Sequence, residues 1–243
     1  MKLISIFLFY SVLFFGPPDT STEVLKKMYG RYAGKWYSTF TFNQTTENYR
    51  NDSLIKTATW YEAIKYPDNF RIDFGDSKDG NAVIFTKDSS YNFRNGKLRR
   101  VTTNTDDLTF LLGGMYFYTI DSVFSKLGQL GYKLDHFHKD KWKGKEVYVI
   151  GANDNIEKLN QLWVDKEKLV LVRFIKYENG RKEEGILENQ KRFGGGWSET
   201  SCTFYMDDKL FQKEIYHDCK ANVVIDPRYF DPGNLKAGTF KVP

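Results

Sequence analysis

The feature that most limits the fold of this chain is a long series of short alternating segments separated by turn residues. In the segment YPDNFRIDF, apolar side chains at Phe70, Ile72 and Phe74 alternate with polar ones. Successive side chains of a strand point to opposite faces, so this pattern predicts a strand with one apolar face and one solvated face that carries Arg71 and Asp73. The apolar face either belongs to a closed core or lines a cavity for an apolar ligand, and the alternation leaves both open.

Segments of the same kind occupy most of the chain. Asn95-Gly96 and Asn179-Gly180 separate neighbouring segments and favour tight hairpin turns. Strands joined by short turns pair antiparallel, and the 17% content of aromatic residues suits strands. We therefore predict one large curved antiparallel sheet of about ten or eleven strands. The strand segments are KWYSTFTFNQ, SLIKTATWYEAIKY, NFRIDF, NAVIFT, SSYNFR, KLRRVT, KLDHFHKDKWKG, KEVYVIGA, NQLWVDKE, LVLVRFIKYENG, RKEEGILENQKRFGGG, WSETSCTFYMDD and KLFQKEIYHDC.

Two regions have helical spacing instead. Within residues 20–34, Val24, Leu25 and Met28 recur at helical intervals and predict an amphipathic helix that ends near Gly34. Its apolar stripe must be buried against another element.

The second helical region lies in the middle of the chain. The spacing predicts a short helix near 107–112 and a clearer one at 121–129, with Asp121 or Ser122 as its N-cap. No linker, low-complexity tract or repeat divides residues 19–243, so we expect one domain with its helices on a single face of the sheet.

The N-terminus has the pattern of a secretory signal peptide. Lys2 precedes an apolar run from Leu3 to Phe15, which is short for a membrane span and is followed by Pro17. We predict that residues 1–18 are a signal peptide. A retained N-terminal anchor is the alternative, because the segment has no Ala-x-Ala cleavage site.

Cys202 and Cys219 are the two cysteines of the chain. An even number in an oxidising compartment suggests a disulfide. However, a hairpin that turns at Asp207-Asp208 would pair Cys202 with Lys213 and leave Cys219 about 20 Å further along the strand. A disulfide needs Cα atoms within about 7 Å, so we expect two free thiols.

Charge and motifs argue against several function classes. The 36 basic and 31 acidic side chains are interspersed, whereas nucleic-acid binding needs clustered basic charge. The GGGW segment at 194–197 lacks the residues of a phosphate loop and predicts a wide turn. His136 and His138 share one face of a strand segment but have no evident third metal ligand. No Gly-x-Ser-x-Gly motif occurs, so we expect neither an enzyme nor a cofactor.

Several motifs occur in an order that is similar to that of a known family. They are the N-terminal helix, the segment Phe40-Thr41-Phe42-x-Gln44, the strand Pro67-x-x-Phe70-Arg71, a helical insert, the strand Leu162-Trp163-Val164-Asp165 and a closing DPRYFDP. This order, over about residues 20–233, resembles the LolA-like family of periplasmic carriers and outer-membrane lipoprotein-sorting proteins. In that family the glutamine of the first segment follows Phe-Thr directly, whereas here two residues are inserted.

The resemblance implies an unclosed β half-barrel whose concave face is covered by helices and holds acyl chains of a lipid or lipoprotein. It also implies a monomeric, non-catalytic periplasmic carrier and allows membrane-bound donor and acceptor proteins as partners. A cargo-free envelope sensor or a protein-docking module on the same fold is the alternative. The residues expected to bind the acyl chain are Trp36, Phe40, Phe42, Trp60, Phe70, Ile72, Phe74, Phe85 and Phe93 from the strands, with Leu25, Met28, Phe124 and Leu127 from the helices.

The chain departs from the family at one position. The residue before the strand proline is often an arginine that ties the covering helices to the sheet, and here it is Tyr66. Lid closure and cargo transfer as in the lipoprotein carriers therefore do not follow from the resemblance.

Overall fold

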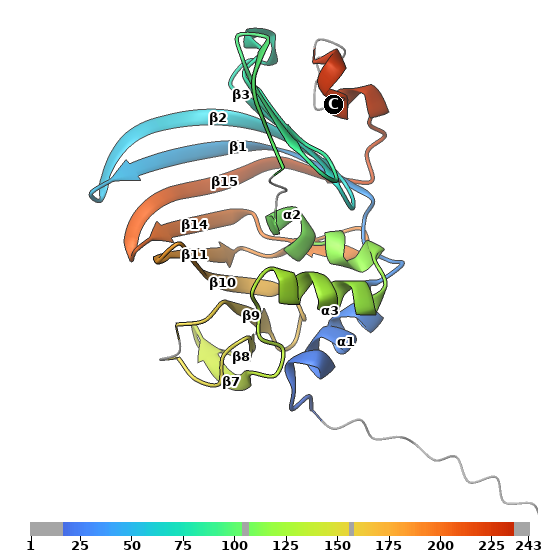
Figure 1. Ribbon diagram of the computed structural model, residues 1–243, viewed down its shortest axis with the longest axis vertical. Helices are drawn as coiled ribbons and strands as arrows, with labels where there is room; N and C mark the ends of the chain where they lie inside the picture. Colours follow the sequence, from blue (N-terminus) through green and yellow to red (C-terminus); the bar gives the residue numbers. More distant parts are fainter. Residues whose placement is uncertain (1–16, 104–106, 156–157, 236–243) are drawn as a thin grey trace, which may run out of the picture.

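A single antiparallel sheet of 13 strands dominates the computed structural model, which describes residues 17–103, 107–155 and 158–235. The sheet curves around three helices and does not close on itself (Figure 1). Within the described residues, no helix is long and apolar enough to cross a membrane. The predicted signal peptide falls almost entirely on residues 1–16, which lie outside the described part of the chain.

All of the segments with strand-like spacing form strands of this sheet, so the expected count of ten or eleven was too low. The strands are β1 (Thr39–Arg50), β2 (Ser53–Lys65), β3 (Asn69–Phe74), β4 (Ala82–Phe85), β5 (Ser90–Arg94), β6 (Lys97–Thr102), β7 (Phe137–Trp142), β8 (Lys145–Ile150), β9 (Gln161–Asp165), β10 (Leu171–Glu178), β11 (Arg181–Glu188), β14 (Ser201–Met206) and β15 (Lys209–Ala221). A separate two-stranded ribbon consists of β12 (Lys191–Phe193) and β13 (Gly196–Ser198).

The strand order explains why helices cover one face. The order is β6-β5-β4-β3-β2-β1-β15-β14-β11-β10-β9-β8-β7, so consecutive strands pair in two meanders that meet where β1 pairs with β15. β6 and β7 lie at opposite edges of the sheet. The chain between them must therefore cross a face of the sheet, and this crossing carries the mid-chain helices.

Three helices occur close to their predicted positions. They are α1 (Ser21–Tyr32), α2 (Asp107–Leu111) and α3 (Ile120–Gln129), with the 3-10 helix η2 (Gly114–Phe117) between the last two. The Thr119 hydroxyl accepts a hydrogen bond from the Ser122 amide at 3.3 Å and caps α3, so the expected caps Asp121 and Ser122 were wrong. The helix that was expected to end near Gly34 ends two residues earlier, at Tyr32.

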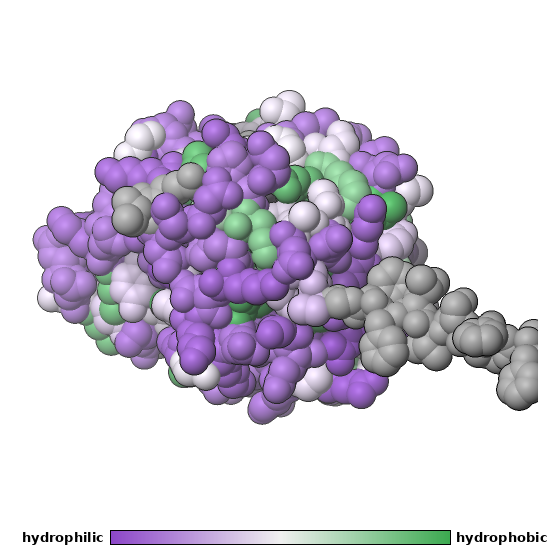
Figure 2. All heavy atoms as spheres, turned by 90° about the horizontal axis from the view of Figure 1, so that it is seen from below, coloured by the Kyte–Doolittle hydropathy of each residue, from purple (hydrophilic) through white to green (hydrophobic). Residues whose placement is uncertain are grey.

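The helices pack their apolar stripes against the concave face. Val24 and Leu25 of α1 and Val123 and Leu127 of α3 are fully buried in one cluster that includes Phe40 of β1. On the face of the molecule in Figure 2, hydrophilic side chains predominate and hydrophobic ones form small separate groups. The apolar contacts that hold the helices in place are thus largely internal.

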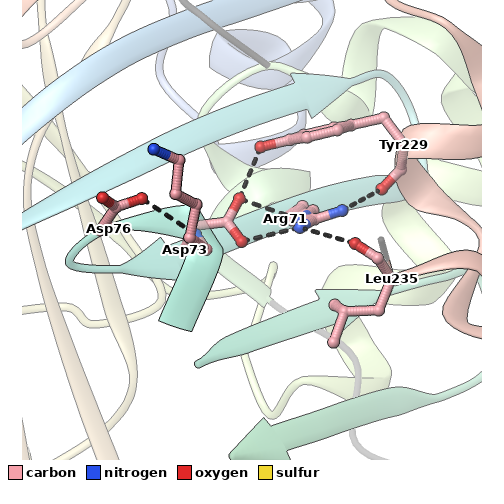
Figure 3. Close-up of polar contacts among 6 residues, drawn as sticks. Arg71, Asp73, Asp76, Tyr229 and Leu235 are labelled. Carbon is pink, nitrogen blue, oxygen red and sulfur yellow. Dashed lines mark hydrogen bonds and ion pairs between the residues drawn. The ribbon is translucent and has the colours of Figure 1, made fainter. Parts of the chain in front are cut away.

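The face of β3 that was expected to be solvated is buried. Arg71 and Asp73 are each 1% exposed, because the C-terminal segment with η3 (Pro227–Phe230) and η4 (Pro232–Asn234) covers them. Arg71 donates to both carboxylate oxygens of Asp73 at 2.8 and 3.0 Å and to the Tyr229 carbonyl at 3.0 Å (Figure 3). The Tyr229 hydroxyl donates to Asp73 at 2.6 Å. These short helical turns lie on the opposite face from α1, α2 and α3, so the expectation that all helices share one face holds for the three α-helices and η2 but not for η3 and η4.

The wide turn expected at the GGGW segment is a tight one: Phe193 pairs with Gly196, so only Gly194 and Gly195 form the turn, and Trp197 belongs to β13. The backbone of Lys35 comes so close to this turn that position 195 must be a glycine: a Cβ atom on Gly195 would lie 1.8 Å from the carbonyl oxygen of Lys35.

The predicted pairing of the last hairpin was wrong by one residue. A β-bulge between Phe204 and Tyr205 shifts the register, so Cys202 lies opposite Glu214 rather than Lys213. Cys219 is further along β15, and both cysteines are free thiols.

We expect the two thiols to differ in the folded protein. Cys202 is 2% exposed, whereas Cys219 is partly exposed, and burial raises the pKa of Cys219 to about 11. A thiol reagent should therefore label Cys219 slowly and Cys202 far more slowly, while unfolding without reductant should release both. Counting labelled thiols by mass spectrometry tests this, and two blocked thiols in an unfolded monomer would contradict it.

Candidate functional site: an apolar cavity with buried carboxylates

A cavity of about 190 Å³ lies between the concave face of the sheet and the start of the helical crossing. A buried water needs only about 10–15 Å³, so this space is large enough for a small apolar group or the end of a chain. Leu108, Thr109 and Leu112, in and directly after α2, line its helical side. Leu187 of β11 and Phe204 of β14 line it from the far half of the sheet.

Six of the predicted ligand-binding residues come together at this cavity. They belong to four neighbouring strands whose register aligns them on one face, as the pairs Ile64–Phe70 and Phe70–Phe85 illustrate. The Phe70 and Phe85 rings stack with centroids 5.6 Å apart. The six residues are Phe40, Phe42, Trp60, Phe70, Ile72 and Phe85.

The predicted helical residues do not reach the cavity. Leu25, Met28 and Leu127 are buried in the core beneath the helices, and Phe124 packs against the edge of that core. A side chain on the inner stripe of a helix meets the sheet directly, so these residues close a dry core instead of lining a space.

Three predicted strand residues are also outside the lining. Trp36 precedes β1 and packs in the core with Tyr116 at a centroid distance of 4.8 Å. Phe74 contacts Trp60 edge to face at the end of β3. Phe93 pairs with Ala82, which pairs with Asp73, so it lies on the opposite face of the sheet, and its assignment to the cavity was wrong.

The cavity also contains carboxylates that the sequence interpretation did not place there. Glu62 of β2, Glu214 of β15 and Glu199, between β13 and β14, all line it, and their exposures are 7%, 7% and 5%. Among the described residues that line it, none is a lysine, arginine or histidine. The concave face therefore carries a cluster of titratable groups that none of the sequence motifs indicated.

The sequence held a signal for two of these glutamates. Glu62 is two residues from both Trp60 and Ile64, and Glu214 is two residues from Tyr216, so strand alternation puts each on the concave face. Because both side chains are charged, the sequence favoured solvated positions for them. Glu199 lies outside any strand, and no periodicity could place it.

A chain of hydrogen bonds joins the polar groups on the β14–β15 side of the cavity. The Tyr216 hydroxyl donates to Glu214 Oε2 at 3.0 Å and lies 3.3 Å from the Cys202 sulfur. The Gln212 side-chain amide also donates to Glu214. Burial raises the pKa of Glu214, and these hydrogen bonds partly oppose that rise. Glu214 is thus held by neutral donors and not by a cation.

Glu199 has fewer partners. Burial raises the pKa of its carboxyl to about 7, its own backbone amide partly opposes this, and Glu214 adds to it. No side-chain hydrogen bond or ion pair to Glu199 occurs among the described residues. Its carboxylate is therefore buried at the cavity without a compensating charge.

Cys202 does not have the setting of a reactive thiol. Burial raises its pKa well above the usual value, and the carboxylates of Glu199 and Glu214 raise it further. Reactive cysteines instead have a lowered pKa and a nearby cation or histidine.

Tyr66 contacts the helical crossing from the sheet side. Its ring stacks on Phe117 of η2 with a centroid distance of 5.6 Å and an interplanar angle of 6°. Its hydroxyl is 3.5 Å from the Leu112 carbonyl oxygen, at the limit of a hydrogen bond. An aromatic contact therefore joins sheet and covering segment at the position where the family often has an arginine.

His136, directly before β7, and His138, within β7, do not act together. His136 bonds the neighbouring Asp135 at 3.0 Å, whereas His138 bonds the Ala152 carbonyl at 2.9 Å and Asn155 at 3.1 Å. In the described part of the chain, no group of three histidine, cysteine or acidic side chains is arranged to hold a metal ion.

Comparisons with known proteins identify the fold. No protein-family model matches the chain, and no curated protein matches it in sequence. A DUF1329 family protein from Desulfovibrio piger has a TM-score of 0.62 at 13% identity, over 89% of this chain and 98% of the other. A domain described as an outer membrane lipoprotein-sorting protein domain, from Vibrio parahaemolyticus, has a TM-score of 0.57 at 12% identity, over 88% and 97%. A LolA superfamily protein from Nitrosomonas europaea has a TM-score of 0.54 at 13% identity, over 88% and 98%. The chain therefore has the LolA-like fold, an unclosed antiparallel half-barrel with helices on its concave face.

Proposed function

We propose that this protein is a non-catalytic periplasmic carrier that binds the acyl chain of a lipid or lipoprotein in its concave cavity. The observation that carries the proposal is the cavity itself, where aromatic and aliphatic side chains of several strands surround a space that the protein does not fill. The carrier-like fold supports it, and the predicted signal peptide at residues 1–18 supports export to the periplasm.

The energy of acyl-chain burial suits a reversible carrier. Each buried CH₂ group contributes about 0.8 kcal/mol, so ten methylenes contribute roughly 8 kcal/mol before the cost of ordering the chain. That cost offsets several kcal/mol. The remaining affinity would hold a chain during transit and still allow its transfer to an acceptor.

The polar groups of the cavity support binding more than catalysis. Cys202 is 2% exposed and its pKa is raised, so the thiol stays protonated and weakly nucleophilic at neutral pH. In the described part of the chain, no histidine lines the cavity to act as its base. A fixed apolar pocket with a few buried polar groups is typical of a ligand-binding site.

The test compares two substitutions on the same face of the same strand. Phe70 lines the cavity and Phe74 does not, although both are partly exposed residues of β3. Phe70→Asp should weaken binding of an uncharged apolar dye by about tenfold or more, because a carboxylate in the pocket cannot be solvated beside an alkyl group. Phe74→Asp should change the affinity by less than about threefold, since its carboxylate can hydrate at the strand end.

Dye titration and urea unfolding of both variants separate binding from folding. Lipids extracted from natively purified protein and identified by mass spectrometry would name the cargo class. If the wild type binds no dye and carries no lipid, the carrier proposal fails and the alternative of a cargo-free sensor or docking module takes its place.

A further inference from the structure

The charge of the cavity is opposite to that of the whole protein. The chain has a formal net charge of +5, with 36 basic residues among its 243. Yet the described residues that line the cavity include three glutamates and no basic side chain. A carrier of fatty acids or phospholipids would be expected to place a cation near the anionic head of its ligand, and the residues at this cavity do the reverse.

The buried carboxylate of Glu199 is a group in the cavity whose charge no cation of the described residues compensates. It is 5% exposed and lines the cavity, and its own backbone amide donates a hydrogen bond to it, but it has neither an ion pair nor a side-chain hydrogen bond among the described residues. Burial of an uncompensated carboxylate is unfavourable, and in native proteins such groups are paired or bind a ligand. Glu214, in contrast, is satisfied by Tyr216 and Gln212.

Aromatic rings surround these carboxylates. Phe42 and Tyr216 stack with centroids 4.3 Å apart, and Trp60, Tyr66 and Phe70 also line the space. The face of an aromatic ring attracts cations, and an aromatic cage with an acidic group is the usual site for an alkylammonium ion. The same rings accommodate the alkyl chain next to it.

We propose that the ligand of this cavity is a cationic amphiphile, with an ammonium nitrogen beside Glu199 and an alkyl chain against the aromatic residues of β1 to β4. This inference rests on the proposed carrier function and specifies its cargo. The nitrogen is either a primary amine, which would donate hydrogen bonds to the carboxylate, or a quaternary ammonium, which the rings alone would bind.

The test uses four ligands of equal chain length at pH 8. Dodecylamine, dodecyltrimethylammonium, dodecanol and laurate, each below its micelle concentration, compete with the uncharged dye N-phenylnaphthylamine. We expect at least one of the two cations to bind about tenfold tighter than dodecanol, and laurate to bind weakest, because like charges repel strongly in a buried site. Comparison of the two cations distinguishes hydrogen bonding from ring contact.

A matched pair of variants assigns the preference to the cavity. Glu199→Gln removes the buried charge and keeps the shape, and it should reduce the cation affinity about tenfold while leaving dodecanol within about twofold. Glu167→Gln makes the same change at an exposed position and should alter neither affinity.

The outcomes separate this inference from the carrier proposal. If laurate binds as tightly as the cations, or if Glu199→Gln affects all four ligands equally, the cationic ligand is wrong and the carrier proposal stands. If no ligand displaces the dye and the dye itself does not bind, both fail. The comparison of the four ligands on the wild type requires no variant to fold.

Discussion

Asp73→Ala should destabilise the protein by about 3–5 kcal/mol, because it leaves Arg71 charged and unpaired in the interior. Both side chains of this ion pair are 2% exposed, and Arg71 contacts Asp73 through two hydrogen bonds. The substitution also removes the acceptor of the Tyr229 hydroxyl. For a chain of this length the loss corresponds to a fall of roughly 6–20 °C in Tm. Urea unfolding followed by circular dichroism measures it.

Two controls identify the cause of this loss. Glu146→Ala breaks the ion pair with Lys166 at the surface of β8, where the glutamate is 64% exposed, and should cost less than about 1 kcal/mol. The double variant Arg71→Met, Asp73→Leu removes both charges together and should recover much of the stability, because apolar side chains can replace a buried ion pair at little cost. A loss below about 1 kcal/mol for Asp73→Ala would show that the C-terminal segment does not bury this pair in solution.

Stability of the ligand-free protein should fall as the pH rises through 7, by about 3 kcal/mol from Glu199 alone. The pKa of this carboxyl is raised to about 7 from 4.5, chiefly by burial. A raised folded-state pKa stabilises the protein below pH 4.5, where the carboxyl is protonated in both states. This contribution is lost as the pH rises and the buried group must ionise. The charged groups Glu62 and Glu214, the thiol of Cys202 and the hydroxyl of Tyr216 share its surroundings.

The difference between wild type and Glu199→Gln isolates this effect from all other titrations. The Gln variant should have nearly the stability of the wild type at pH 4.5 and exceed it by about 3 kcal/mol at pH 8. Urea unfolding of both proteins at several pH values between 4.5 and 8.5 gives the two curves. Curves that run parallel over this range would mean that Glu199 is solvated and does not face the cavity as a buried carboxyl.

The cavity could be predicted from the sequence only in part. Alternation along β1 to β4 correctly selected Phe40, Phe42 and Phe70, because side chains two residues apart in a strand share a face. The same rule applied to Glu62, but a charged residue in a strand is usually solvated, whereas this one is 7% exposed in the cavity between the sheet and the α2 segment. Phe93 was misassigned because hydrophobicity alone does not distinguish the two faces of a strand when both are covered.

The sequence by itself determined the local structure of this protein. Periodicity of two and tight turns specify antiparallel strands, and the stripes around Leu25 and Leu127 specify helices, because each pattern depends on neighbours a few residues away. Tertiary structure alone decided which polar groups are buried. Tyr229 covers Arg71 from 158 positions along the chain, and the glutamates of the cavity come from β2, β15 and the segment between β13 and β14. Whether a polar side chain is buried depends on which segment packs over its strand. That segment is distant in the sequence, so no local sequence pattern can reveal it.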